Sequence, residues 1–530
     1  MTRRFALFGA VLVALAVVYV LAWRTQPGAA RTAGQTEGPQ TVAVTSVTRS
    51  CPPPAPNTGA AHIAMIAMPA QNAAAKTGAV SGPGTTVTGS AMLSAVPATA
   101  TPAKAAPAAK ATATPAAKAT ATKAPAAKAT SGTAGAQPVT VSVPGALTTV
   151  TAPAATGSGG TAIAAAGQMA EGFEAEQANA SGMGVVSCTH PESDMWFVGT
   201  GVGDGASTIR LYLMNTGDLA ATANVTIITD TGLQPGLNTG ITVAPHQFVT
   251  ENIAPLARGS AALGLHVQTT SGQVAASVWE GSGGSGAWLP QASAPSTHLV
   301  VPGLTVASSA ARLFVTVPGA ADAQLRVVAF TAQGKFPQFG STPVDAPAAA
   351  TSSFALSSLG ASAAGLALSS NVPIIAGVLV PGSGIGSFTA AAAPVTQQGV
   401  VAGNPATRGL TVGLVLTAPA TAAHADITVI GAGNSGGSAA GTPQAGAPQA
   451  VTVQAGHTLA MAVPRPGNAR QPFAIVITPL AGSGPLYAAR VVTSGAGGLS
   501  APVSSLLPVQ SALTTITLPP AQNSYTAILP

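Results

Sequence analysis

A strand pattern that recurs about every 100 residues constrains the fold of this chain more than any other feature. Three alternating segments open the repeats, TIRLYLM (208–214), ARLFVTV (311–317) and GLTVGLVL (409–416), and they start 103 and 98 residues apart. A second alternating segment, a closing pair around a Gly, Ser or Pro turn and a Gly/Ser-rich run follow each. Short strands separated by such turns are typical of β-sandwiches. We predict an all-β fold of tandem β-sandwich modules, immunoglobulin-like or similar, after one N-terminal transmembrane helix.

The alternation in the first repeat also assigns side chains to faces. Successive side chains of a strand point to opposite sides, so every second residue shares a face. We expect one face, which is apolar, to cover the core, and the other to point away from it. The apolar face holds Ile209, Leu211 and Leu213, and the other face holds Thr208, Arg210 and Tyr212.

The N-terminus carries a membrane-length apolar run. Phe5 to Trp23 contains nineteen uncharged residues, and a helix of that length spans about 28 Å, close to the thickness of a bilayer core. Arg3 and Arg4 favour a cytoplasmic N-terminus. We expect residues 5–23 to anchor the protein in the cell membrane as a single pass, with the C-terminus extracytoplasmic. The alternative is a cleaved signal peptide, which would make the protein secreted.

Composition and pattern divide the chain into six segments. Residues 1–24 are the transmembrane anchor or signal segment, and 25–40 are a juxtamembrane linker. An N-terminal β module spans 41–205 and contains a low-complexity Ala/Pro/Lys/Thr insertion at 98–136. The β-sandwich repeats 1, 2 and 3 occupy 206–302, 303–400 and 401–530, the last with a C-terminal tail.

Charge is unevenly distributed between the two parts of the chain. Residues 1–170 have a net charge of +10 and residues 171–530 a net charge of −4, within a total of +6. The β-rich part therefore lacks the basic surface that nucleic acid binding requires, and we expect no nucleic acid partner. The insertion has nothing larger than Ala to bury, apart from its lysine stems, so we interpret it as a solvated spacer or loop. Weak electrostatic contact of its five lysines with an anionic polymer or lipid is the alternative.

Two cysteines, Cys51 and Cys188, are the only thiols. They form no CxxC pair, which excludes a zinc ribbon or thioredoxin-type site. In the oxidising compartment implied by export, one disulfide between them is the simplest interpretation. The bond would turn the insertion into an excursion loop of the N-terminal module; without it, the insertion could act as a long stalk.

Several segments resemble one family of exported proteins. SCTHPESDMWFVG, TIRLYLMNTGDLAATANVTI and VAPHQF are similar to actinobacterial proteins with an N-terminal hydrophobic segment and only a domain-of-unknown-function label. The resemblance covers most of residues 40–530 outside the insertion. It implies export and a similar architecture, and it implies no catalytic residue. The positions that match are Cys51, Pro52, Cys188, Pro191, Asp194, Trp196 and Phe197.

Other motifs do not predict a catalytic, cofactor or metal site. GNSGG (433–437) matches G-x-S-x-G, but a nucleophile elbow needs a helix after it, and a polar loop follows Ser435. His190, Glu192 and Asp194 lie close in sequence and could bind a hard cation. We interpret them as a polar turn, because three ligands are few for such an ion. The alternating glycines at 199–205 lack the spacing and the helix of a dinucleotide site.

Two functions of different classes follow from these features. The first is a non-catalytic cell-envelope protein whose extracytoplasmic β-sandwich array binds or spaces envelope components. The second is a carbohydrate-binding protein, or an enzyme that acts on wall polymers. Glycosidases need two carboxylates about 5–10 Å apart, and from residue 190 onward only Glu192 and Asp194 are neighbours in sequence. We expect no enzyme, and partners among cell-wall polymers or envelope proteins.

Aromatic residues bear on the second function. Trp196, Trp279 and Trp288 could line a sugar-binding platform. Isolated tryptophans in a sandwich more often fill its core, and aromatic residues make up only 4% of the chain. A core role is therefore the expectation for all three.

Overall fold

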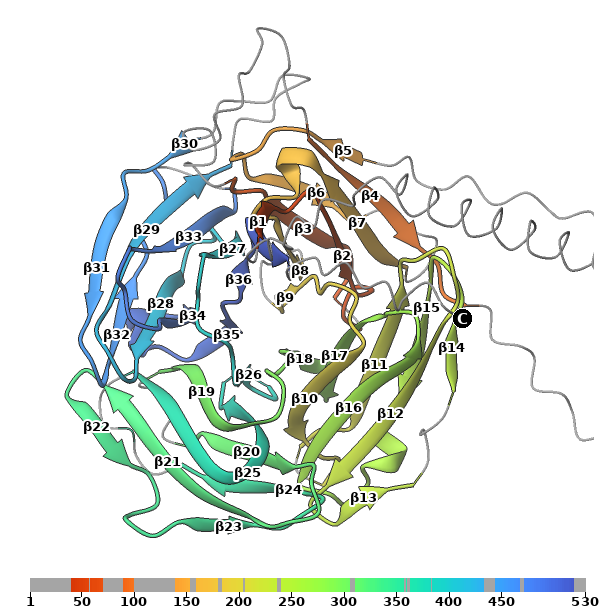
Figure 1. Cartoon of the computed structure of the whole chain (residues 1–530), viewed down its shortest axis with the longest axis vertical. Helices are drawn as coiled ribbons and strands as arrows, with labels where there is room; N and C mark the ends of the chain where they lie inside the picture. Colours follow the sequence, from red (N-terminus) through yellow and green to blue (C-terminus); the bar gives the residue numbers. More distant parts are fainter. Residues whose placement is uncertain are drawn as a thin grey trace, which may run out of the picture. The chain divides into compact units, whose positions relative to one another are not determined.

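The computed structural model shows an assembly of antiparallel sheets (Figure 1). The described residues contain no α-helix and three short 3-10 helices. One compact unit is Val44–Thr514, and the other combines Met1–Ala43 with Thr515–Pro530. The structure describes residues 40–56, 58–69, 89–99, 139–152, 159–179, 184–203, 205–235, 240–305, 310–356, 359, 363–382, 384–432, 444–467 and 471–518.

Residues 194–289, which we call module 2, consist of two sheets that face each other. One sheet has the order β10–β16–β12–β13, with β14 also paired to β12, and the other has the order β15–β11–β17–β18. Side chains from both sheets share one buried core. The strands are β10 (Asp194–Thr200), β11 (Thr208–Asn215), β12 (Ala221–Thr229), β13 (Gly232–Gln234), β14 (Ile241–Val243), β15 (Gln247–Asn252), β16 (Ala262–Ser271), β17 (Ala275–Ser282) and β18 (Ser285–Leu289).

The faces expected for residues 208–213 agree with this core. Ile209, Leu211 and Leu213 are fully buried between the two sheets, while Arg210 is exposed on the other face. Tyr212 is also on that other face, yet it is buried. It belongs to a cluster with residues of the neighbouring module, so module packing covers part of a face that the strand pattern left open.

Residues 46–187 form module 1, which has the same strand order as module 2. Its sheets are β2–β7–β4–β5 and β6–β3–β8–β9. The sequence pattern treated this region as different from the repeats, because its strands are short and the insertion interrupts them. The strands are β2 (Ser46–Cys51), β3 (Ala61–Ile66), β4 (Ser90–Val96), β5 (Val139–Val141), β6 (Thr148–Thr151), β7 (Gly160–Ala166), β8 (Glu174–Asn179) and β9 (Val186–Ser187).

Residues 296–390 form module 3, in which one long strand serves both sheets. The first half of β25 pairs with β19 and β21, and its second half pairs with β20 and β26. In modules 1, 2 and 4 two separate strands take these places. The strands are β19 (Ser296–Leu304), β20 (Arg312–Val317), β21 (Ala323–Thr331), β22 (Gly334–Pro337), β23 (Val344–Ala346), β24 (Ala350–Ala355), β25 (Ala364–Val380) and β26 (Ser387–Ala390).

Residues 398–512 form module 4. One sheet runs β30–β29–β33–β27–β36, with β31 also on β29, and the other runs β32–β28–β34–β35. The strands are β27 (Gln398–Asn404), β28 (Leu410–Ala418), β29 (Ala423–Gly431), β30 (Gln444–Ala445), β31 (Gln449–Val453), β32 (His457–Ala462), β33 (Phe473–Pro479), β34 (Tyr487–Ser494), β35 (Val503–Pro508) and β36 (Ser511–Ala512).

The shared strand order differs from that of an immunoglobulin domain. If β10, β11, β12, β15, β16, β17 and β18 are lettered A to G, module 2 has sheets A–E–C and D–B–F–G. Immunoglobulin constant domains have sheets ABED and CFG. Alternation in a sequence tells which face of a strand is buried, but it does not say which strand lies beside it.

The modules also begin one strand earlier than the sequence pattern predicts. The opening strands β10, β19 and β27 pair with β16, β25 and β33 of their own modules. The expected boundary at 205/206 therefore excludes β10 from its module, and the boundaries at 302/303 and 400/401 fall within β19 and β27. These opening strands contain Gly or Pro near their ends, which weakens their alternation in the sequence.

Four joints of one kind connect the modules. In each module, the sheet that contains the first strand packs against a sheet of the next module, the one that contains that module's second strand. Val96 thus meets Met214 between modules 1 and 2, and Trp196 lies in one cluster with Phe314 between modules 2 and 3. Val415 joins the core of module 3, and module 4 returns to module 1 through a cluster of β3 and β27 residues. The contacts close a cycle of four modules (Figure 1).

Glycines allow close approach at two of these joints. A Cβ on Gly264 of module 2 would overlap Thr316, and a Cβ on Gly365 of module 3 would overlap Thr417. Each of these threonines shares a hydrogen bond of 2.9 Å with a second buried threonine of its own module. Only a residue without a side chain lets the two sheets meet at that separation.

The remaining strands pair two distant parts of the chain. β1 (Gln40–Ala43) is antiparallel to β37 (Thr515–Leu518). The segment 41–48, expected to be one strand, is thus split between β1 and β2. The expected anchor at 1–24, with the apolar run 5–23, lies outside the described residues. Within those residues no helix combines the length and the apolar character that a membrane crossing needs.

The insertion begins and ends at one sheet edge. β4, before it, and β5, after it, are antiparallel neighbours, with Leu93 opposite Val139. The chain therefore leaves module 1 and returns to the same place, as an excursion loop does. Residues 100–138 themselves lie outside the described residues.

Candidate functional site

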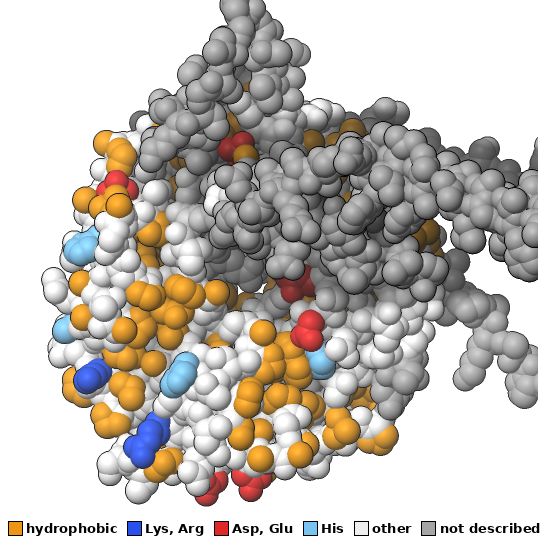
Figure 2. All heavy atoms as spheres, viewed as in Figure 1, with side chains coloured by type: hydrophobic (Ala, Val, Ile, Leu, Met, Phe, Trp, Pro, Cys, Tyr) orange, Lys and Arg blue, Asp and Glu red, His pale blue; other side chains and the backbone are white. Residues whose placement is uncertain are grey.

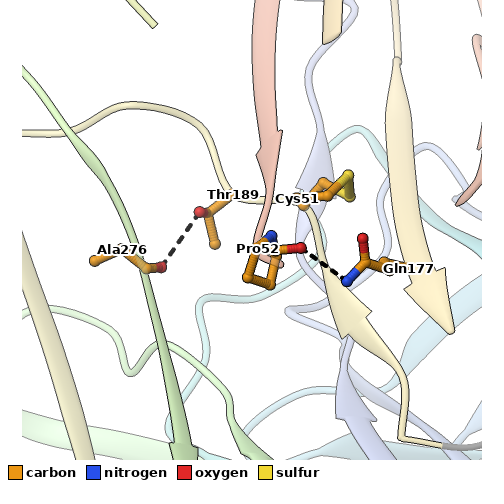
Figure 3. The surroundings of a disulfide bond; sticks show 6 residues. Cys51, Pro52, Gln177, Thr189 and Ala276 are labelled. Carbon is orange, nitrogen blue, oxygen red and sulfur yellow. Dashed lines mark hydrogen bonds between the residues drawn. A yellow bond between two sulfur atoms is a disulfide. The ribbon is translucent and has the colours of Figure 1, made fainter. Parts of the chain in front are cut away.

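The disulfide joins the two cysteines that the sequence singled out. Cys51 ends β2, Cys188 follows β9, and their sulfur atoms are 1.97 Å apart in a buried position. Two hydrogen bonds lie close to the disulfide (Figure 3). Gln177 Nε2 donates to the carbonyl oxygen of Pro52 at 2.9 Å, and Thr189 Oγ1 donates to that of Ala276 in module 2 at 3.3 Å. The predicted disulfide is confirmed, and it joins the first strand of module 1 to the end of that module.

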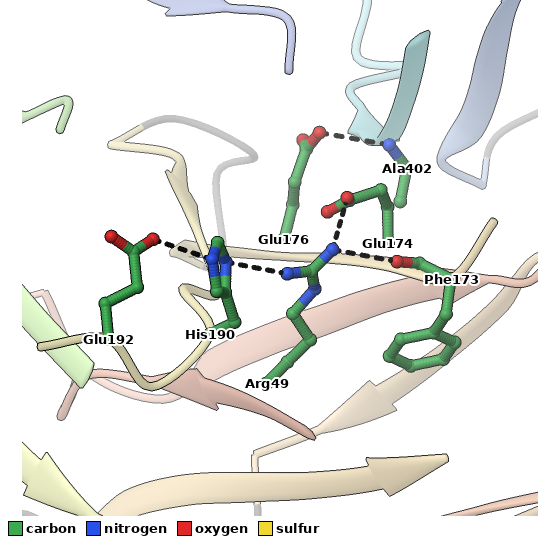
Figure 4. Close-up of polar contacts among 7 residues, drawn as sticks. All are labelled: Arg49, Phe173, Glu174, Glu176, His190, Glu192 and Ala402. Carbon is green, nitrogen blue, oxygen red and sulfur yellow. Dashed lines mark hydrogen bonds and ion pairs between the residues drawn. The ribbon is translucent and has the colours of Figure 1, made fainter. Parts of the chain in front are cut away.

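A chain of charged side chains lies beside the disulfide (Figure 4). The Arg49 guanidinium donates to Glu174 Oε1 at 2.5 Å and to the Phe173 carbonyl oxygen at 3.2 Å. Its Nη1 lies 3.1 Å from His190 Nδ1, and His190 Nε2 lies 2.7 Å from Glu192 Oε1. Because a guanidinium only donates hydrogen bonds, His190 Nδ1 accepts one from Arg49. The N–H of His190 is then at Nε2, and it donates a hydrogen bond to Glu192.

This chain extends from module 1 into module 2. Gln291 Nε2 donates to Glu192 Oε2 at 2.9 Å, and the backbone of Glu192 pairs with Val274. Burial raises the pKa of Glu174, and the positive charge of Arg49 acts against that rise. An ion pair with further hydrogen bonds on both partners offsets part of the cost of removing charge from water.

A small cavity adjoins the charged chain. Modules 1, 2 and 4 all contribute to its wall, which includes Arg49, Glu174, His190, Ser277 and Gln291. Its volume of about 40 Å³ is far below the roughly 300–1,000 Å³ of sites for small molecules. A sugar ring or peptide does not fit, so the charged chain acts as a connection between modules.

A second buried carboxylate holds module 4 against module 1. Glu176 Oε1 accepts from the backbone N–H of Ala402 at 3.0 Å, and Oε2 accepts from that of Gly403 at 3.1 Å. These amides are available because the pairing of β27 with β33 is irregular between Val401 and Asn404. Burial raises the pKa of Glu176, and Arg490 and the two amides oppose the rise.

Two further charges are fully buried inside modules. Arg490 of β34 donates through Nη2 to Ser505 Oγ at 3.1 Å, and burial lowers its pKa. Glu280 of β17 accepts from the Thr200 hydroxyl at 2.6 Å and from the Thr200 N–H at 3.3 Å. Burial raises the pKa of Glu280 to about 8, because those two hydrogen bonds do not compensate for the lost solvation. Gly199 leaves the space that the Glu280 carboxylate occupies.

The residues considered as a cation site are separated in the structure. His190 and Glu192 bond to each other, whereas Asp194 faces His266 at 3.3 Å. Among the described residues no cluster of three or more His, Cys, Asp or Glu side chains could hold a metal ion. The segment 433–437 with Ser435 lies outside the described residues.

The three tryptophans do not form an exposed platform. Trp196, Trp279 and Trp288 are 6%, 5% and 7% exposed. Trp196 stacks on His266 with ring centres 3.8 Å apart, and Trp279 meets Trp288 edge to face at 5.1 Å. They fill the joints beside module 2, as aromatic side chains with a large apolar area do in well-packed interiors.

Sequence reasoning did not single out the buried charges at 176, 280 and 490 or the partly buried pair at 49 and 174. A signal was present, because AARVV and SVWEG each place one charge within an apolar strand. In a chain with only 6% charged residues, such a position indicates a side chain with a specific partner.

The comparisons with known proteins identify a family. The model of a family described as "Family of unknown function (DUF5719)" matches residues 139–464, from β5 of module 1 to the end of β32 in module 4. The search of curated proteins and the search of solved structures found no match. The match covers more than half of the chain and confirms the expected relation to a domain of unknown function. The chain therefore belongs to the DUF5719 family.

Proposed function

We propose that the protein is a non-catalytic component of the cell envelope, anchored through residues 5–23, whose extracytoplasmic tandem β-sandwiches bind or space other envelope components. The observation that carries the proposal is the buried Cys51–Cys188 disulfide. Stable disulfides of this kind are typical of oxidising compartments outside the cytoplasm. If the N-terminal segment is cleaved, the same body is secreted.

The cycle of modules supports a spacing or binding role. Each module is held on two sides, and the charged chain and the Glu176 contact link module 1 to both its neighbours. Most carboxylates in the interior of the four modules form hydrogen bonds with an arginine or with backbone amides. These hydrogen bonds support the packing. On the face drawn in Figure 2, charged side chains are few among the described residues.

Fractionation and thiol labelling of intact cells test the proposal. We expect the protein in the membrane fraction after a carbonate wash, and we expect protease added to intact cells to degrade it. A membrane-impermeant maleimide should label no thiol until a reductant is added under denaturing conditions. A protein with two free thiols in the cytoplasmic fraction would contradict the proposal.

A further inference from the structure

We propose that an open cleft on module 2 binds an anionic polysaccharide, through Arg210 and Arg258. This inference rests on the proposed envelope function and names the class of envelope component that the protein binds. The cleft has a volume of about 510 Å³, within the range of ligand sites. Its wall comes from Val202, Ala206 and Ser207 before β11, from the start of β11, and from Asn252 and the segment that follows β15.

The sheet register positions Arg210. It lies opposite Asn252 of β15 on one side and opposite Trp279 of β17 on the other. Directly opposed residues of an antiparallel sheet point to the same face, so these three side chains form a row. Burial raises the pKa of Tyr212, and a hydrogen bond from Arg210 together with its charge opposes the rise, so the guanidinium also contacts Tyr212. Arg258 reaches the same cleft from the turn after the 3-10 helix Ala254–Leu256.

The charge of the cleft favours an anion. Both arginines are exposed, and none of the described residues in the wall of the cleft is acidic. Residues 171–530 contain only nine Lys and Arg and have a net charge of −4, so two guanidinium groups in one cleft stand out from their surroundings. A guanidinium presents a planar set of donors that matches the oxygens of a carboxylate or a phosphate.

A second hollow continues from the first and fits a polar sugar. It has a volume of about 110 Å³ and shares Ser207, Thr208 and Arg210 with the first. Trp279, the turn 281–285 and Pro56 of module 1 form the rest of its wall. The Thr208 hydroxyl suits a sugar hydroxyl, and the Ser207 hydroxyl, which donates to the Gly281 carbonyl oxygen at 3.2 Å, can accept from one. The indole edge supplies an apolar wall. A polymer of acidic sugars fits this pair of hollows. It would place an acidic group at the two arginines and a neighbouring sugar ring beside Trp279.

Module 3 contains a natural control for Arg210. Arg312 occupies the equivalent position, one residue before the core residue Leu313, as Arg210 precedes Leu211. Arg312 is held within its own module, because it donates to Ser353 Oγ at 3.1 Å and lies 5.2 Å from the centre of the Phe314 ring. Its neighbour across β25 is the aliphatic Leu379 where Arg210 has Trp279.

Binding measurements on the full-length protein in detergent test the proposal. The probes are oligogalacturonate for carboxylate-bearing sugars, a phosphomannan for phosphate-bearing sugars, and neutral cellodextrin of matched length. We expect binding to at least one anionic probe, weakened by salt, and no binding to cellodextrin. Arg210→Gln and Arg258→Gln should each weaken it at least tenfold, whereas Arg312→Gln should leave it within twofold.

The outcomes separate the anionic groups and the competing explanations. Preference for oligogalacturonate would assign carboxylates to the site, and preference for the phosphate polymer would assign phosphodiesters. Absence of binding to both anionic probes would overturn the inference, and so would equal losses in Arg312→Gln and Arg258→Gln. Thermal unfolding of each variant checks that the substitutions leave the fold intact. Fractionation of cells tests the envelope location independently, so failure of one does not imply failure of the other.

Discussion

Glu280 should make the stability of module 2 fall as the pH rises. In the folded chain burial raises its pKa to about 8, compared with 4.5 when it is free in water. Between these values the folded protein retains a proton that the unfolded chain has released, so raising the pH favours unfolding. The stability that protonated Glu280 contributes is fully present below pH 4.5. It declines between pH 4.5 and about pH 8 and is lost above that range.

The magnitude follows from the size of the pKa difference. One pKa unit corresponds to about 1.4 kcal/mol, so the full shift is worth on the order of 5 kcal/mol in unfolding free energy. Glu280 is fully buried, and its Oε1 has no hydrogen-bond partner among the described residues. Solvent therefore does little to reduce the cost of its charge.

Glu280→Gln is the variant that isolates this effect. The amide keeps an oxygen for Thr200 but does not ionise, and its buried NH₂ costs about 1–3 kcal/mol at every pH. We expect urea unfolding, followed by tryptophan fluorescence between pH 5 and 9, to show a falling stability difference between wild type and variant. Glu174 and Glu176 also have raised pKa values, and their contributions cancel in that difference. A difference that stays constant with pH would refute the reasoning.

Three further changes test the connections within and between modules. Replacing Cys51 and Cys188 together by serine should lower the unfolding free energy by about 4–5 kcal/mol, because a loop with a sequence separation of 137 is no longer closed in the unfolded chain; a loss below 1 kcal/mol in denaturant titrations would contradict this. Glu176→Ala should cost about 1–3 kcal/mol for each buried amide left without an acceptor, and hydrogen exchange should speed up at those amides of β27. Gly264→Ala should lower stability by about 1–3 kcal/mol through overlap with module 3, whereas Gly319→Ala, which meets no atom within 4 Å, should show little change in thermal unfolding.

Local pattern was enough to predict the class of fold and the covalent link. Alternation along 208–213 identified the core side chains of β11, because side-chain direction depends only on position within a strand. The turn-rich spacing indicated short strands and excluded long helices for the described part of the chain. Two cysteines permit only one pairing within a chain, so the disulfide followed once export was expected.

The tertiary structure alone decided which strands are neighbours and what lies between modules. Strand pairing joins residues such as Asp194 and Gln268, and no local period records a partner so far along the chain. The same holds for side chains on outward faces. Tyr212 and Trp279 are polar-tipped or isolated in the sequence, and in the structure they share one buried cluster with residues of module 1.

The buried charges show most clearly the difference between what the sequence determines and what the tertiary structure decides. Glu176 of β8 lies in a strand with little apolar character, and its role depends on two amides more than two hundred residues away in β27. The sequence by itself determined that a charged residue is rare in this chain, but its pattern did not predict the strand β8 that carries Glu176. Only packing of module 4 on module 1 decided that it has a partner, because electrostatic and hydrogen-bond energies depend on distance in space and on burial from water.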